Sequence, residues 1–264
     1  MNLQEQKEIT IKRDFYVVKD NRLIQKSRYD LSLTEQRGVA YICSMIKPVK
    51  PSSATCSAPY QLEYEFNILE YAKICGLYYT DGGKLYEEIR DLLKRLMQKI
   101  IHVELPDGDE MMIAWLSKVY FSKRNGIAKI EISKDMAPFL FDLQEKFTIY
   151  GLLNILAMKS RYSVRIYELV RSHAYQKIIA YEIERLKELL MVDGVKSYVR
   201  FPDFRRYVLD PAMTEINRYT DLQVSYDAIT KGRKVTKIQF TIDKKPYLDQ
   251  FIALTNTTKE IEKT

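Results

Sequence analysis

Apolar residues recur at helical spacing three times in the first half of the chain, and strand-like segments follow them. The spacing predicts three helices, over Leu33 to Ile46, Asn67 to Cys75 and Lys84 to Gln98. A hairpin is expected next, with strands over Ile100 to Leu105 and Met111 to Phe121 and a turn at Pro106-Asp107-Gly108-Asp109. Three helices followed by a hairpin are typical of a winged-helix domain.

The second half of the chain shows the same order of elements. Its predicted helices cover Arg161 to Ala174, Ile183 to Met191 and a stretch from Pro202 to Tyr219. Two strand-like runs then follow, Leu222 to Tyr226 and Val235 to Ile242. The repetition lies in the pattern, because no repeat of individual residues is evident.

These patterns predict an α+β fold class with two tandem winged-helix domains. Between the two copies, Ile127 to Ile132 alternates like a strand and Lys134 to Glu145 is expected to be a short helix. The predicted division is a flexible N-terminal segment (1–20), a first winged-helix domain (21–148), a second one (149–246) and a C-terminal tail (247–264).

The helix that begins near Pro202 carries the most informative residues. Phe204, Val208, Leu209, Ala212, Met213 and Ile216 share one face, which predicts the buried side. Asp203, Arg206 and Tyr207 then point outward, where a recognition helix presents side chains to base edges in the major groove. Arg200 and Arg205 flank this face and are better placed for phosphates. Pro211 predicts a bend.

Lys231-Gly232-Arg233-Lys234 forms a basic turn between the last two predicted strands. In a winged helix such a turn is the wing, and it can settle on a sugar-phosphate backbone or in a minor groove. A solvated surface turn would have the same sequence. The neighbouring Arg205 and Arg206 favour the binding interpretation.

Charge is distributed unevenly along the chain. There are 42 Lys and Arg residues against 35 Asp and Glu, a formal net charge of +7, and six of these net positive charges fall in residues 151–264. The second domain is therefore the expected seat of polyanion binding, although an excess of this size could also serve solubility alone. The predicted first hairpin has an acidic turn, so the first domain is expected to make only secondary DNA contacts, through Lys94 or Arg95.

Several other classes of protein are disfavoured by the sequence. It has no long uncharged apolar run and no apolar secretory segment near Met1. We therefore expect a cytoplasmic location and no membrane span. The three cysteines lack paired spacing, the two histidines are far apart and no phosphate-binding glycine-rich loop is present. We expect no catalytic residues, no metal site and no cofactor.

Six short motifs follow one another along the chain: Asn21-Arg22-Leu23-Ile24, Leu33-Thr34-Glu35-Gln36-Arg37, the run from Met158 to Glu168, Phe201-Pro202-Asp203-Phe204-Arg205-Arg206, Glu215-Ile216-Asn217 and Lys231-Gly232-Arg233. In their order and spacing, these motifs resemble the initiator replication proteins of iteron-controlled theta plasmids. Together they span about residues 20 to 242. By position, the resemblance implies that Asp203 and Arg206 contact bases, with Arg205 as a further candidate.

The resemblance implies a function as well as a fold. Such proteins bind duplex DNA at repeated origin sites called iterons, open the origin, and recruit the host replication initiator and helicase. They exist as monomers in equilibrium with homodimers that form through the first domain, repress their own gene and so control copy number. Lys159, Ser160 and Arg161 match the start of the second domain and could hold a phosphate, although Ser160 is better explained as a helix cap. A winged-helix transcription regulator and a protein scaffold that binds no nucleic acid are the alternatives.

Overall fold

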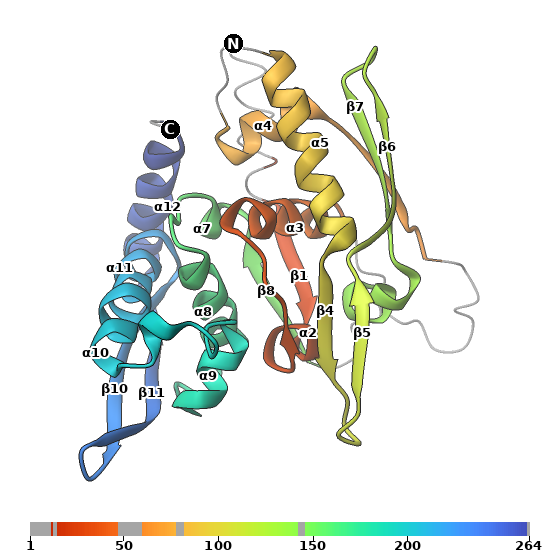
Figure 1. Cartoon of the computed structure of the whole chain (residues 1–264). Coiled ribbons are helices and arrows are strands. Elements are labelled where there is room, and N and C mark those ends of the chain that lie inside the picture. The colour runs from red at the N-terminus through yellow and green to blue at the C-terminus, as the bar shows by residue number, and fades with distance from the viewer. Residues whose placement is uncertain (1–11, 13–14, 47–59, 78–81, 142–145, 263–264) are drawn as a thin grey trace, which may run out of the picture.

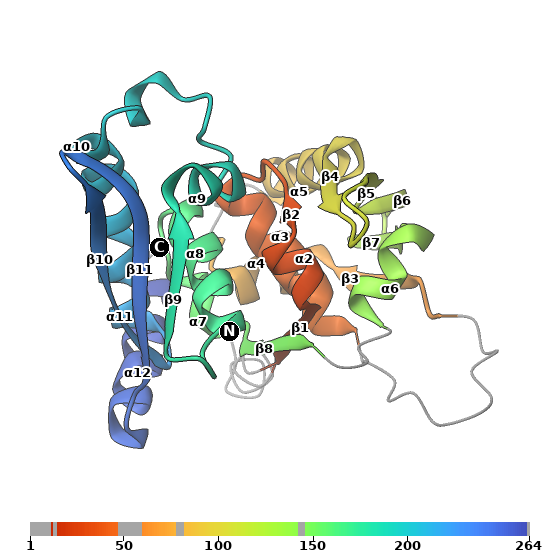
Figure 2. The same ribbon diagram turned by 90° about the horizontal axis from the view of Figure 1, so that it is seen from below.

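The structure is a computed structural model of the chain, and it describes residues 12, 15–46, 60–77, 82–141 and 146–262. Figure 1 shows two α+β domains side by side, with the C-terminal domain on the left of the view. Figure 2 shows that α8 and α9 lie between the C-terminal sheet and the first domain. Both domains are winged helices, which confirms the predicted fold class.

The second winged helix has the predicted helices and hairpin, together with one strand that the sequence pattern missed. Its elements are α8 (Arg161–Ser172), β9 (Ile178–Glu182), α9 (Ile183–Leu189), η2 (Lys196–Tyr198), α10 (Phe201–Phe204), η3 (Arg205–Leu209), α11 (Asp210–Tyr219), β10 (Leu222–Lys231) and β11 (Lys234–Lys244). The unpredicted strand β9 pairs antiparallel with β11, so the sheet order is β10-β11-β9.

The first winged helix repeats this topology. Its elements are α3 (Leu33–Met45), β3 (Glu63–Asn67), α4 (Ile68–Cys75), α5 (Gly82–Gln98), β6 (Leu116–Ser122) and β7 (Ile127–Ile132). The sheet order β6-β7-β3 corresponds strand for strand to β10-β11-β9. In Figure 1 the β6–β7 hairpin points to the top of the view, whereas β10–β11 points to the bottom.

This topology shows that the predicted wing of the first domain was wrong. The hairpin directly after α5 consists of β4 (Ile100–Glu104) and β5 (Glu110–Ala114), and β4 also pairs with β2 (Ser27–Arg28), so these three strands form a separate sheet in the order β2-β4-β5. The expected strand Met111 to Phe121 is interrupted at the buried Trp115, where β5 ends and β6 joins a different sheet. The acidic hairpin is therefore an insertion, and the wing is the β6–β7 hairpin.

The predicted helix ends of the first domain agree with the structure. The side chain of Ser32 accepts a hydrogen bond from the backbone N–H of Glu35, whose carboxylate accepts one from the N–H of Ser32 in return. Such a reciprocal cap satisfies two donors that the first turn of a helix leaves open. At the end of α4, Gly76 adopts a φ of 68°, the left-handed conformation that closes many helices. The segment from Pro48 to Pro59, whose proline, serine and alanine content predicts a loop, lies outside the described residues.

Two segments near the chain ends form regular elements that were not predicted. Residues 16–20 were expected in a flexible segment, but they form β1 (Tyr16–Asp20), which pairs antiparallel with β8 (Phe147–Gly151). Residues 247–264 were expected to be a tail, but α12 (Tyr247–Glu262) packs on α11 and on α7 (Leu153–Leu156). The remaining short elements are α2 (Asn21–Gln25), η1 (Lys134–Met136) and α6 (Ala137–Leu140), so the helix predicted from Lys134 is shorter than expected.

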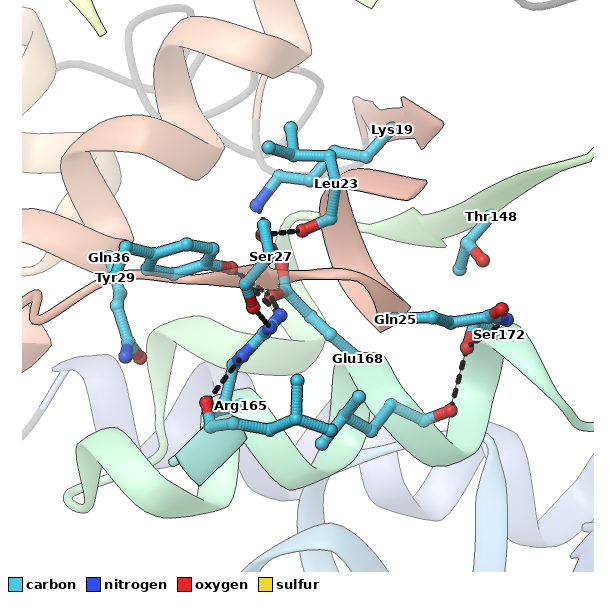
Figure 3. Close-up of polar contacts among 12 residues, drawn as sticks. Lys19, Leu23, Gln25, Ser27, Tyr29, Gln36, Thr148, Arg165, Glu168 and Ser172 are labelled. Atoms are coloured by element: carbon cyan, nitrogen blue, oxygen red, sulfur yellow. Dashed lines mark hydrogen bonds and ion pairs between the residues drawn. The ribbon is translucent and has the colours of Figure 1, made fainter. Parts of the chain in front are cut away.

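A buried polar cluster joins α8 to the first domain (Figure 3). Lys19 Nζ donates to Glu168 Oε1 at 2.6 Å, and both side chains are only 4% exposed. Tyr29 donates to the other carboxylate oxygen at 3.2 Å and itself accepts a hydrogen bond from Arg165, which also donates to the carbonyl of Ser27. Burial opposes ionisation of Glu168, but the charges of Lys19 and Arg165 outweigh it and hold the pKa of this carboxyl below its ordinary value.

Candidate nucleic-acid interface

The helix predicted to read bases runs without interruption from Phe201 to Tyr219 through α10, η3 and α11. All six apolar side chains assigned to its inner face are buried, as predicted: Phe204, Val208, Leu209, Ala212, Met213 and Ile216. Arg206 and Tyr207 are exposed, and the guanidinium of Arg206 lies 5.4 Å from the centroid of the Tyr207 ring. Burial of one face therefore fixes which side chains this helix offers to solvent.

The expected bend at Pro211 takes a different form. The helix continues through the proline, and the distortion is a π-helical turn over Arg205–Leu209 immediately before it. In this turn the N–H of Asp210 donates to the carbonyl of Arg205, five residues earlier. Because proline has no N–H to donate to the carbonyl four residues back, a wider turn accommodates it without ending the helix.

This wider turn supports a contact between the helix and the hairpin. Arg205 Nε donates to Asp210 Oδ2 at 3.3 Å, and the hydroxyl of Tyr226 on β10 donates to Asp210 Oδ1 at 2.6 Å. Partial burial and the bond to Asp210 raise the pKa of Tyr226 to about 12. The three side chains line a cleft of about 500 Å³ between the helix and β10.

The N-terminal end of the helix is anchored by aromatic contacts. Tyr198 packs edge-on against Phe204 and against Tyr162 of α8, with ring centroids 6.5 and 6.1 Å apart. Arg200 follows as the N-cap residue, with an exposed side chain 3.6 Å from the carboxylate of Asp203. These contacts place Arg200 and Asp203 beside Arg206 on the first turns of the helix.

The wing of the second domain is a long hairpin with the predicted basic turn. Strands β10 and β11 pair from Leu222 and Lys244 to Lys231 and Lys234. Gly232 has a φ of 63° at the first of the two central positions, as in type II′ turns, and Arg233 occupies the second. Lys231, Arg233 and Lys234 are all exposed, so the tip of the hairpin carries three neighbouring positive charges.

Among the remaining predicted site residues, Lys159 and Ser160 contact the same helix through their backbone, since their N–H groups donate to the carboxylate of Glu215 on α11 at 3.0 and 3.3 Å. Ser160 caps α8 by accepting from the N–H of Tyr162 at 3.2 Å, Lys159 pairs with Glu260, and Arg161 pairs with Asp30. On α5, Arg95 donates to the buried Glu35 at 2.9 Å, whereas Lys94 is exposed. Ser160, Lys159, Arg161 and Arg95 thus have structural partners, and a role of any of these residues in DNA binding stays a prediction.

A second basic tip was missed by the sequence analysis. The turn of the first domain's wing is Lys123-Arg124-Asn125-Gly126, with both basic side chains exposed and Gly126 at a φ of 63°. An Asn-Gly pair between strands is a strong hairpin signal, and it was available in the sequence. The acidic β4–β5 hairpin instead contacts the second domain, because Glu104 pairs with Arg185 of α9 at 2.6 Å.

Two other kinds of feature are absent from the part of the chain that the structure describes. Within the residues that the structure describes, no three His, Cys, Asp or Glu side chains are grouped so that they could hold a metal ion. In the same part of the chain, no helix has both the length and the apolar character that crossing a membrane requires.

Known protein families can be compared with this architecture. Residues 16–171 match the family described as "Initiator Replication protein, WH1", and residues 182–242 match "Initiator Rep protein, WH2". The chain belongs to the initiator replication protein family. This result confirms the family that the sequence motifs resemble, and it identifies the two winged helices of this replication initiator with the family's WH1 and WH2 domains.

Individual relatives agree with this assignment. An Escherichia coli "Replication initiation protein" is 25% identical over 87% of this chain and 70% of its own length. The Escherichia coli "PI protein" is 29% identical over 61% of this chain and 60% of its own length. The fold is also that of a crystal structure of the Pi initiator protein in complex with iteron DNA, with a TM-score of 0.69, 21% identity, and coverage of 88% of this chain and 98% of that one.

Proposed function

We propose that this replication initiator binds the iterons of a plasmid origin as duplex DNA, mainly through its second winged helix. The observation that carries the proposal is the placement of the exposed Arg206 and Tyr207 on the helix whose inner face is buried, with a lysine- and arginine-rich wing on the same domain. A helix of this kind reads base edges in the major groove, and a basic wing binds the backbone or minor groove. The Pi initiator, which has the same fold, binds iteron DNA.

The first winged helix contributes a second contact in this proposal. Lys123 and Arg124 at the tip of the β6–β7 hairpin correspond topologically to the wing of the second domain. The exposed Lys94 lies on α5, the counterpart of the recognition helix. Two modules that contact successive grooves one helical turn apart would cover roughly 20 base pairs.

Binding would be followed by deformation of the duplex and recruitment of host replication proteins, without covalent chemistry by this chain. The equilibrium between monomer and homodimer, dimer formation through the first domain and repression of the chain's own gene belong to the same proposal. Membership of the initiator family supports this function over that of a transcription regulator with no role in replication.

The test is selection of the wild-type protein and of Arg206→Ala against a random duplex library at physiological salt. We expect the wild type to enrich one motif of about 20 base pairs. Arg206→Ala should lose about 1–3 kcal/mol of binding free energy and relax one base position within that motif. Lys259→Ala is the matched control, because it also removes one exposed positive charge but lies on α12, outside the proposed DNA-binding surface. No enrichment by the wild type would refute the proposal, and an unchanged motif for Arg206→Ala would refute the assigned orientation of the helix.

A further inference from the structure

Asp210 accepts one hydrogen bond from within the recognition helix and one from the wing strand β10. It accepts from Arg205 Nε at 3.3 Å and from the Tyr226 hydroxyl at 2.6 Å. We propose that Asp210 and Tyr226 are positioning residues, which hold the guanidinium of Arg205 so that its two Nη groups face a guanine in the major groove. This inference rests on the proposed function, because it requires duplex DNA on this surface.

The π-helical turn makes this arrangement possible. In a regular α-helix, side chains five residues apart differ by about 140° in direction, so Arg205 and Asp210 would point to different sides. The turn over Arg205–Leu209 closes a backbone hydrogen bond between residues 205 and 210, which brings the two side chains onto one side of the helix. Pro211 favours this turn, since it cannot make the α-helical hydrogen bond.

The geometry of the guanidinium group then determines what Arg205 can recognise. Its five N–H donors lie in one plane, and Asp210 binds the Nε side. The two Nη groups form the other edge, whose spacing matches the O6 and N7 acceptors of guanine. Because the Arg205 side chain is 61% exposed, this edge can reach a ligand outside the cleft.

The negative charge of Asp210 requires a control in any test of this inference. A carboxylate on a DNA-binding surface repels phosphates, so removing one should by itself strengthen binding. Asp227 also lines this cleft, and it is exposed and forms no ion pair with any residue that the structure describes. It therefore provides a matched control for Asp210, because substitution with asparagine changes the charge identically at both positions and disturbs the Arg205 contact only at position 210.

The experiment measures the affinity of full-length variants for the duplex that the wild type enriches from a random library. Each guanine of that duplex is also replaced in turn by 7-deazaguanine, which lacks the N7 acceptor. We expect Asp227→Asn to bind slightly more tightly than wild type, whereas Asp210→Asn and Tyr226→Phe bind about three- to tenfold more weakly. Both weakened variants should become insensitive to one 7-deazaguanine substitution that weakens wild-type binding.

Double mutants separate positioning from a general structural effect. In an Arg205→Ala background, Tyr226→Phe should cause no further loss of affinity, because the side chain that it positions is absent. Tighter binding by Asp210→Asn, like that of Asp227→Asn, or additive losses in the double mutant would overturn the inference. If thermal unfolding shows that Asp210→Asn does not fold, Tyr226→Phe decides alone, since it removes only a hydroxyl. A wild type that enriches no duplex would instead refute the proposed function, and the inference with it.

Discussion

Replacement of Glu168 by glutamine should destabilise the protein more than any change to a surface ion pair. The carboxylate of Glu168 accepts from Lys19, Tyr29 and Tyr150, and it is 4% exposed. The amide is nearly the same size but leaves the buried charge of Lys19 without a counterion. Removing one partner of a buried pair costs about 3–5 kcal/mol of unfolding free energy, and we expect a loss in this range.

Glu65→Gln is the matched control for this prediction. Glu65 pairs with Lys129 at 2.9 Å, but the two side chains are 58% and 56% exposed, so loss of this pair should have little effect on the free energy of unfolding. Urea unfolding of both variants can be followed by the fluorescence of Trp115, the single tryptophan, whose ring packs edge-on against Tyr29. A Glu168→Gln variant as stable as the control would refute the account of the buried cluster.

Three other predictions concern pH, packing and the wing. The pKa of Glu168 is lower in the folded state than in the unfolded state. The stability that ionised Glu168 gives the fold is therefore fully present above the ordinary glutamate pKa of about 4.3, and it is lost as the pH falls through the lowered pKa. Acid titration followed by circular dichroism should show that Glu168→Gln is less sensitive to acid than the wild type, and an unchanged profile would contradict this. Gly76→Ala should lower the unfolding free energy by about 1–3 kcal/mol, because Gly76 has a φ of 68° and an added Cβ would lie 2.6 Å from Ile261 Cγ2. If this variant unfolds at the same urea midpoint as the wild type, α12 does not pack against Gly76. Lys234→Ala should weaken binding to all duplexes alike and reduce the slope of log affinity against log salt by about one unit, and a sequence-dependent loss in anisotropy titrations would contradict a backbone contact.

The second winged helix was predictable because its main signals are local. The inner face of its recognition helix follows from the spacing of Phe204, Val208 and Ile216, and the wing follows from the glycine in a basic turn between two strands. Both patterns depend on a few neighbouring residues. Strand β9 was missed because its five residues, Ile178–Glu182, show no clear alternation of apolar and polar side chains.

The first winged helix was harder to predict because its sheets combine distant segments. The run from Met111 to Leu116 is apolar without a break, so the sequence suggests one strand where two strands join different sheets. Sheet membership depends on pairing with β2 and β3, far away along the chain, and local pattern does not encode it. The pairing of β1 with β8 was missed for the same reason.

The polar contacts that join α8 to the first domain, and those within the candidate site, were also beyond the reach of sequence patterns. Lys19 and Arg165 are charged residues that pattern analysis places at the surface, yet both are buried with Glu168 as a partner. The contact of Arg205 with Asp210 depends on a π-helical turn, whereas helical-wheel reasoning assumes a regular helix. Pro211 indicated a distortion at this place but not its form.

Hydroxyl-radical footprinting on the selected duplex tests the central claim, that both winged helices bind one DNA site, most directly. Wild-type protein should protect two stretches about one helical turn apart. A Lys123→Ala, Arg124→Ala double variant should lose protection at one end of the site, and Lys231→Ala with Lys234→Ala should lose it at the other end. A single protected stretch, or loss at the same end with both variants, would contradict the account.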